Sequence, residues 1–466
     1  MLSKTLKGIF LAFISITFIC ALVGCGVVAV YYNISAIAII TSFLGFGILF
    51  FLFYLLMKKS KLDARILLII VLVVGAALRL VYVICANQPP MSDFKTYHDL
   101  AIMLSNGIAP KSSYVSMFPH VMGLPMFLAP FYWLFGPSEL VAQIVNVGLD
   151  ILTAWLLFLI SWKLFHSRKG ALITAFLFSM APTVIFYCEI IGTEKLFTFL
   201  VVLLIYTVLH IQRKPVLFSL AAGFIAGITN AVRPCGLMLI IAIILFGIAA
   251  WKFSIGKKTV CLAVVIGTYL VMILANTQLV SAINQTEVAT KAAGWNLYVG
   301  ANAESFGQWN QEDAELFEEK VSSGLSPNQI HSEFKDLAIE RLKENGIFRN
   351  IVLWIGKFTV IWATDISVFS YLQQEQIHLN ALQSFPLESL STAFYLWAVI
   401  LTWMGAYRIW KKDENFSLMV LLVILGSVGM HLFAEVMGRY GYTSIALFYI
   451  IAGYGVICQK KFGLAD

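Results

Sequence analysis

The sequence carries little charge, since Lys, Arg, Asp and Glu make up 12% of its 466 residues. A soluble domain carries about 25%. Hydrophobic residues account for 60%, and the mean hydropathy is +0.86. Such a chain cannot cover its own surface in water, which excludes a soluble enzyme with one anchor, a disordered chain and a coiled coil. The apolar runs are long and continuous rather than alternating, which argues against a β-barrel. The composition therefore predicts an all-α polytopic membrane protein.

Several motifs of common enzyme classes are also missing. The sequence holds no Walker A motif, dinucleotide fingerprint, HExxH or paired CxxC, so it gives no support to ATP-driven transport or zinc hydrolysis. The seven cysteines lie in or beside apolar runs without metal-ligand spacing. One Asp and scattered Glu do not make a convincing metal site, so a divalent metal is unsupported but metal dependence stays open, and no cofactor is assigned with certainty. The net charge of +7 includes no long basic run, so nucleic acid is not an expected partner.

The apolar segments predict about twelve membrane spans, each close to the twenty residues that a bilayer requires. Two further stretches, 121–136 and 350–371, are ambiguous, which gives a range of twelve to fourteen. With both termini cytoplasmic and twelve spans, all basic clusters fall on the inner side. The predicted spans are 8–32, 34–57, 66–86, 138–162, 170–187, 194–211, 216–232, 235–252, 259–282, 391–409, 416–434 and 441–459.

This topology divides the chain into four regions. Residues 1–65 form an N-terminal hairpin, and 66–282 form a membrane core that includes an external loop at 87–137. Residues 283–349 form an external polar segment, and 350–466 contain the C-terminal membrane helices. From Glu287 to Arg349 the chain has eleven acids and six bases, which suits an external location. Within this segment the pattern predicts a loop at 294–302 and a helix from 326 to about 343, ended by Gly346.

Asp93 is the first candidate functional residue. It follows the third predicted span and the turn at Pro89-Pro90, and it precedes a predicted helix from Phe94 to Ser105. A carboxylate just outside a span can act as a general base on a hydroxyl. The alternative is that Asp93, or Ser92, only caps this helix.

Other ionisable residues also lie at the predicted outer edge of the membrane, where charge is costly and usually paired or functional. An arginine fork suits a phosphate diester. In the alternative interpretation the arginines pair with nearby acids or reach lipid headgroups. Glu435 lies four residues before Arg439, which fits a helical ion pair, and Glu194 could serve only to orient an arginine. The set comprises His120, Glu194, Arg233, Glu435 and Arg439.

Four short patterns resemble polyprenyl-phosphate-sugar glycosyltransferases of the GT-C fold, the branch with the protein O-mannosyltransferases and lipid A aminoarabinose transferases. The resemblance runs from about Ala76 to the C-terminus. Phe94 stands where family members often have a second acid, and Phe118-Pro119-His120 replaces a Lys-Pro-Pro pattern. The matching patterns are Ser92-Asp93-Phe94 with the following helix, Thr193-Glu194, Gly227…Ala231-Val232-Arg233-Pro234, and Glu435…Gly438-Arg439-Tyr440.

The resemblance implies transfer of a sugar from polyprenyl phosphate, with inversion, to an extracytoplasmic glycan, lipid or protein. By resemblance, Asp93 is the base, and Arg233 and Arg439 bind the donor phosphate. His120 and Lys357 are further phosphate candidates, Glu194 and Glu435 supporting acids. Candidates for contacting the acceptor or sugar are Tyr97, Trp295, Asn296 and Tyr298.

Some of these residues have a plain structural alternative, namely headgroup contact for Lys357 and an aromatic packing role for the loop at 294–302. The chain is expected in a bacterial plasma membrane, with the active site on the external face.

Two other functions stay open at this point. One is a lipid-linked glycan polymerase or ligase, which shares such donors. The other is a secondary transporter or flippase, for which the sequence offers no paired half.

Overall fold

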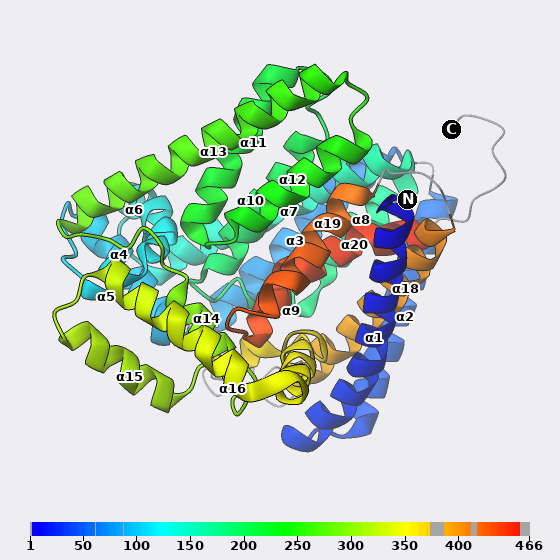
Figure 1. Ribbon diagram of the computed structural model, residues 1–466. Coiled ribbons are helices and arrows are strands. Elements are labelled where there is room, and N and C mark those ends of the chain that lie inside the picture. Colours follow the sequence, from blue (N-terminus) through cyan, green and yellow to red (C-terminus); the bar gives the residue numbers. More distant parts are fainter. Residues whose placement is uncertain (1, 61, 87, 373–385, 412–416, 457–466) are drawn as a thin grey trace.

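The computed structural model describes residues 2–60, 62–86, 88–372, 386–411 and 417–456, and its regular structure is helical (Figure 1). Within these described ranges, seven helices are long and apolar enough to cross a membrane. These helices coincide with seven of the twelve predicted spans. They are α1 (Leu2–Tyr31), α2 (Ala36–Lys59), α3 (Ala64–Ala86), α7 (Glu139–Phe165), α11 (Pro215–Val232), α13 (Ile255–Asn284) and α18 (Leu387–Trp410).

The other five predicted spans are shorter helices. The segment predicted at 170–187 is broken, because Pro182 cannot continue α8 and instead opens α9. The structure thus confirms a polytopic all-α membrane protein with seven candidate spans, and a count of twelve stays a prediction. The shorter helices are α8 (Arg168–Met180), α9 (Pro182–Phe186), α10 (Thr193–Val208), α12 (Gly236–Ala250), α19 (Leu418–His431) and α20 (Tyr442–Val456).

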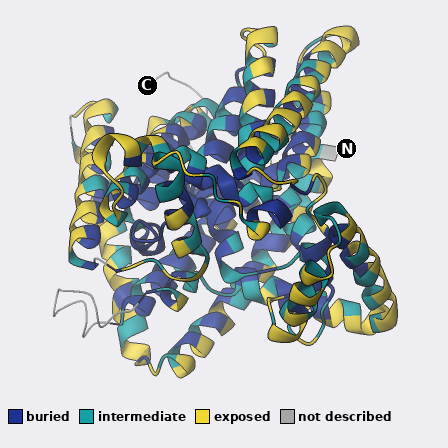
Figure 2. Ribbon diagram, turned by 90° about the vertical axis from the view of Figure 1, so that its left-hand side faces the viewer, coloured by how far each residue is buried: buried dark blue, intermediate teal, exposed yellow. Residues whose placement is uncertain are grey.

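The centre of the bundle is formed by α8, α10 and α20. Residues Tyr442–Gly455 of α20 are all buried, and the helix packs against α8, α10 and α18. The buried interior in Figure 2 contrasts with the exposed outer helices. The N-terminal helices α1 and α2 lie along α18 on one side of the molecule (Figure 1). The predicted N-terminal hairpin is therefore attached to the C-terminal helices.

The two ambiguous stretches are not candidate spans in the structure. Residues 121–136 contain α6 (Gly123–Phe135), which has 13 residues and an internal Pro130 and is short of the twenty that a span requires. Residues 350–371 contain the second half of α16 (Pro327–Trp362) and a short 3₁₀ turn, η2 (Ser367–Ser370). The break in α16 lies at Gly346, whose φ is 65°. The predicted helix end at this glycine is confirmed, because a positive φ suits a residue without Cβ.

The two predicted external segments pack together around one hydrophobic cluster. The first contributes α4 (Ser92–Ser105), α5 (Ser113–Met117) and the 3₁₀ turn η1 (Pro119–Met122); the second contributes α14 (Gly294–Gly300), α15 (Gln311–Ser322) and the start of α16. The stretch at 294–302 is thus largely helical, and the predicted loop was wrong. Its spacing brings Trp295, Tyr298 and Val299 onto the cluster. The cluster includes Leu100, Met117, Phe118, Trp295, Tyr298, Val299, Ile330 and Phe334.

Candidate functional site

Four charged side chains from distant parts of the chain meet beside the helices of the predicted external segments. Arg439 Nη2 donates to Asp93 Oδ2 at 2.9 Å, and its Nε lies 3.7 Å from Glu194 Oε1. Arg233 Nη2 donates to the same Glu194 oxygen at 2.5 Å, and its Nε donates to Thr193 Oγ1 at 2.8 Å. The Glu194 carboxylate therefore orients the guanidinium groups of both arginines. The Asp93 carboxylate contacts Arg439 alone, on its more exposed side.

The local sequence explains how these residues reach one place. Pro234 favours an extended backbone at the residue before it, so Arg233 has φ −145° and ψ 135° and ends α11. Glu194 lies in the first turn of α10. A Cβ on Gly192 would lie 2.4 Å from Glu194 Oε2 and 3.0 Å from Phe94 Cε1. This close approach of backbone to side chains is why glycine suits position 192.

Asp93 does not cap α4, which corrects the alternative interpretation. The helix begins at Ser92, and its N-cap is Met91, with no side-chain hydrogen bond. Asp93 lies in the first turn, where the helix dipole favours a negative charge. Its side chain is 40% exposed, whereas those of Arg439 and Glu194 are 9% and 2% exposed. Asp93 is therefore the member of the cluster most accessible to a second molecule.

Aromatic rings enclose the two arginines. The Arg439 guanidinium lies 5.2 Å from the ring of Phe94 and 5.5 Å from that of Tyr371. Arg233 lies 5.6 Å from the Phe197 ring and also faces Tyr440. Such cation–π contacts hold a guanidinium in place while leaving its N–H groups free to bind an anion. The sequence patterns did not single out Phe197 or Tyr371.

Glu435 occupies a different position from the one its spacing suggests. It lies in the non-helical segment before the 3₁₀ turn η4 (Gly438–Gly441), so the predicted helical ion pair with Arg439 was wrong. Among the described residues, Arg439 pairs with Asp93 and Glu194. Burial raises the pKa of Glu435 to about 7, while Arg439 acts to lower it. Burial thus favours the protonated form of this carboxyl more than in an exposed glutamate.

His120 and Tyr97 adjoin the cluster. Burial, with Arg233 and His331 nearby, lowers the pKa of His120 to about 4, so its imidazole is neutral at pH 7 and adds no positive charge for a phosphate. Its Nδ1 is buried without a hydrogen-bond partner among the described residues. Tyr97 lies one turn after Asp93 in α4. Burial raises the pKa of its phenol, with Asp93 the next cause, so the hydroxyl stays protonated.

Lys357 and Asn296 form hydrogen bonds with the backbone of residues 432–435, the segment that precedes Arg439. Lys357 is 1% exposed, and its Nζ donates to the carbonyls of Leu432 at 3.0 Å and Ala434 at 2.9 Å. The backbone N–H of Glu435 donates to the Asn296 carbonyl at 2.7 Å. These contacts join α14 and α16 to the segment 432–435, which precedes Arg439. They favour a structural role for Lys357 over phosphate binding.

Trp295 and Tyr298 lie in the hydrophobic cluster shared by the two predicted external segments. Their exposed fractions are 8% and 7%. Trp295 packs on Phe317 and Phe334, and the Tyr298 hydroxyl accepts a hydrogen bond from Arg341 Nη2 at 2.5 Å. This placement favours packing over direct contact with a sugar.

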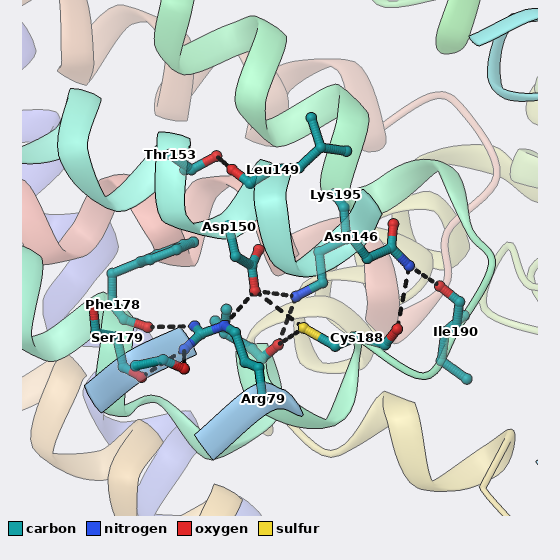
Figure 3. A network of polar contacts seen from close by, with 12 residues as sticks. Arg79, Asn146, Leu149, Asp150, Thr153, Phe178, Ser179, Cys188, Ile190 and Lys195 are labelled. Atoms are coloured by element: carbon teal, nitrogen blue, oxygen red, sulfur yellow. Dashed lines mark hydrogen bonds and ion pairs between the residues drawn. The ribbon is translucent and has the colours of Figure 1, made fainter. Parts of the chain in front are cut away.

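A buried polar network that was not identified from the sequence adjoins the cluster through Lys195, the residue after Glu194 (Figure 3). Asp150 Oδ2 accepts from Arg79 Nε and from Lys195 Nζ, each at 2.7 Å. Lys195 Nζ also donates to the Val184 carbonyl at 2.6 Å, while Asn146 donates to two carbonyls of the loop before α10. Arg79, Asp150 and Lys195 are no more than 2% exposed. The sequence signal that could have identified them is that each is a charged residue inside a predicted span.

This network secures the loop and first turn that carry Thr193 and Glu194. Arg79 also donates to the carbonyls of Phe178 and Ser179 at the end of α8. Five helices, namely α3, α7, α8, α9 and α10, and the loop before α10 are thereby joined next to Glu194. Among the described residues, no group of three His, Cys, Asp or Glu side chains is placed to hold a metal ion.

A family comparison bears on this part of the chain. Residues 119–276 match the sequence profile of the dolichyl-phosphate-mannose-protein mannosyltransferase family. The match confirms, over these residues, the resemblance predicted from the sequence. Glu194 and Arg233 lie inside the matched segment, and Asp93 and Arg439 lie outside it. No curated protein matches the chain at a significant level.

Several solved structures are similar to this one. Oligosaccharyltransferase AglB from Archaeoglobus fulgidus, in complex with an inhibitory peptide and a dolichol-phosphate, is 13% identical, with 83% of this chain and 50% of that chain covered and a TM-score of 0.47. An oligosaccharyltransferase from the same organism, tethered to an acceptor peptide, is 14% identical, with 85% and 49% covered and a TM-score of 0.47. The present chain thus spans about half the length of these proteins. ArnT from Cupriavidus metallidurans, bound to undecaprenyl phosphate, is 12% identical, with 84% and 78% covered and a TM-score of 0.38.

Proposed function

We propose that this protein is a membrane glycosyltransferase of the GT-C type, which moves a sugar from polyprenyl phosphate to an acceptor at the outer face of a membrane. The observation that carries the proposal is the cluster itself. A half-exposed carboxylate, Asp93, pairs with the buried Arg439, and Arg439 shares Glu194 with the partly buried Arg233. The family match, which includes Glu194 and Arg233, supports the same reaction class.

In the proposed reaction Asp93 accepts the proton of an acceptor hydroxyl. The acceptor oxygen forms a bond to the anomeric carbon as the bond from that carbon to the phosphate oxygen breaks. The electron pair leaves with polyprenyl phosphate, and attack from the opposite face inverts the anomeric configuration. Arg233 and Arg439 stabilise the charge on the leaving phosphate through charge-assisted hydrogen bonds.

The distribution of basic residues supports the outer face as the location of this reaction. Lys58 and Lys59 lie in the last turn of α2, and Lys163 lies in the last turn of α7. Glu194 begins α10, whereas Arg213 and Lys214 follow its other end. Because basic residues are retained in the cytoplasm, this distribution supports an outer location for the helix ends that carry the cluster.

The proposed reaction is tested by a donor comparison with purified protein in lipid nanodiscs. Undecaprenyl phosphate carrying a single radiolabelled sugar is compared with undecaprenyl diphosphate carrying an oligosaccharide, each with a cell-envelope extract as acceptor. We expect sugar transfer and release of undecaprenyl phosphate from the first donor only, because two arginines opposed by one buried acid suit one phosphate.

Two outcomes would overturn the proposal. Use of the diphosphate donor alone would indicate a polymerase or ligase. Movement of intact donor across a liposome membrane, without cleavage of the sugar–phosphate bond, would indicate a flippase.

A further inference from the structure

We propose that Arg439 exchanges partners during the reaction, binding Asp93 before the donor arrives and the donor phosphate afterwards, so that donor binding releases the base. This inference rests on the proposed function. It follows from the fact that the same guanidinium contacts the candidate base, at 2.9 Å, and is one of the two candidate phosphate ligands.

The first argument is that Arg439–Asp93 is the ion pair of the cluster that is most exposed to solvent. The Asp93 side chain is 40% exposed, Arg439 is 9% exposed, and Glu194 beneath it is 2% exposed. An anion that approaches from the open side therefore meets the Arg439–Asp93 contact before it meets Glu194. Because the Asp93 side of this ion pair is open to water, which screens the pair and weakens it, a phosphate can displace the Asp93 carboxylate.

The second argument is charge. Arg233, Arg439 and Glu194 together carry one net positive charge, and Asp93 brings the cluster to neutrality. A sugar phosphate diester carries one negative charge, which is the charge that Asp93 supplies in the pair. The two anions therefore compete for Arg439, and simultaneous binding would leave the site with a net negative charge.

The third argument is that Arg439 has other contacts that keep it in place. Its guanidinium lies over the rings of Phe94 and Tyr371, and its Nε, without a hydrogen-bond partner among the described residues, lies 3.7 Å from Glu194. Asp93 can therefore turn away while Arg439 stays. A carboxylate freed from a guanidinium is a stronger acceptor for a hydroxyl proton. Donor binding thus both supplies the electrophile and activates the base.

The exchange is tested by measuring the dissociation constant of farnesyl phosphate for detergent-purified protein. Asp93→Asn removes the competing charge with little change of shape, and we expect binding about two- to fivefold tighter than wild type, in the range for a weak ion pair. Arg439→Gln should weaken binding at least about tenfold. Asp99→Asn is the matched control, because Asp99 lies on the same helix but pairs with Lys95, and it should leave binding unchanged.

The outcomes separate the exchange from the function on which it rests. Asp93→Asn that binds equally or less tightly, with Arg439→Gln weakened, would overturn the exchange and leave the phosphate site intact. Equal tightening by Asp99→Asn would also overturn it, since general repulsion would then explain the gain. Wild-type protein that does not bind farnesyl phosphate would contradict the donor site and the exchange together.

Discussion

Replacing Asp93 by asparagine is expected to lower the rate of sugar transfer by about 10²–10⁴-fold, the usual contribution of a general base. An asparagine keeps the shape of the side chain and can still contact its neighbours, but it cannot accept the acceptor's proton. The measurement is the turnover of undecaprenyl-phosphate-linked sugar by purified protein, together with the yield and membrane insertion of the variant. We expect normal yield, because Asp93 is half-exposed and lies at the start of a surface helix.

The kinetic pattern separates a base from a residue that only holds Arg439. Loss of the base should lower kcat, while the KM for the donor stays the same or falls, because a negative charge beside Arg439 has been removed. Asp93→Glu retains a carboxylate and should keep measurable turnover. A raised donor KM with unchanged kcat in Asp93→Asn would contradict the assignment of the base.

Replacing Asp150 by asparagine is expected to have the largest effect on stability. The change leaves Arg79 and Lys195 buried without a counter-charge, although both are no more than 2% exposed. Breaking a buried ion pair by removal of one partner costs about 3–5 kcal/mol. We expect lower yield and a markedly lower unfolding temperature in detergent, measured by tryptophan fluorescence.

Lys195→Met provides the matched control for this prediction. It leaves the Arg79–Asp150 pair, joined at 2.7 Å, in charge balance, so its cost should be clearly smaller than that of Asp150→Asn. If both variants unfold at the same temperature, the shared carboxylate is not what stabilises the loop before α10.

The sequence predicted the polytopic class and seven of the spans, because long apolar runs are local signals. The site residues stay a prediction, made from ionisable groups at the ends of those runs. The convergence of Asp93 and Arg439, 346 positions apart, is a property of packing, which only the structure reveals. Glu435 shows that residue spacing alone does not establish an ion pair. Its four-residue distance from Arg439 suggests an ion pair, but the intervening backbone is not helical, so the two side chains do not follow the helical rule.

The predicted external segment at 283–349 was the least predictable part of the chain. The stretch at 294–302 has the glycine and asparagine content of a loop, but packing of Trp295 and Tyr298 against Phe334 favours a short helix. The buried network was missed for another reason. Arg79, Asp150 and Lys195 lie within apolar runs, and each taken alone indicates only an unusual charge. Their shared hydrogen bonds become apparent once α3, α7 and α10 are packed together.

The most direct test of the account is where a polyprenyl phosphate binds. A polyprenyl phosphate with a photoreactive group on the isoprenoid nearest the phosphate would be crosslinked to the protein in nanodiscs, and the labelled peptides identified by mass spectrometry. The account predicts labelling at the end of α11 near Arg233 and in η4 near Arg439, abolished by excess farnesyl phosphate. Competed labelling confined to the basic connections, such as residues 252–258, would contradict it.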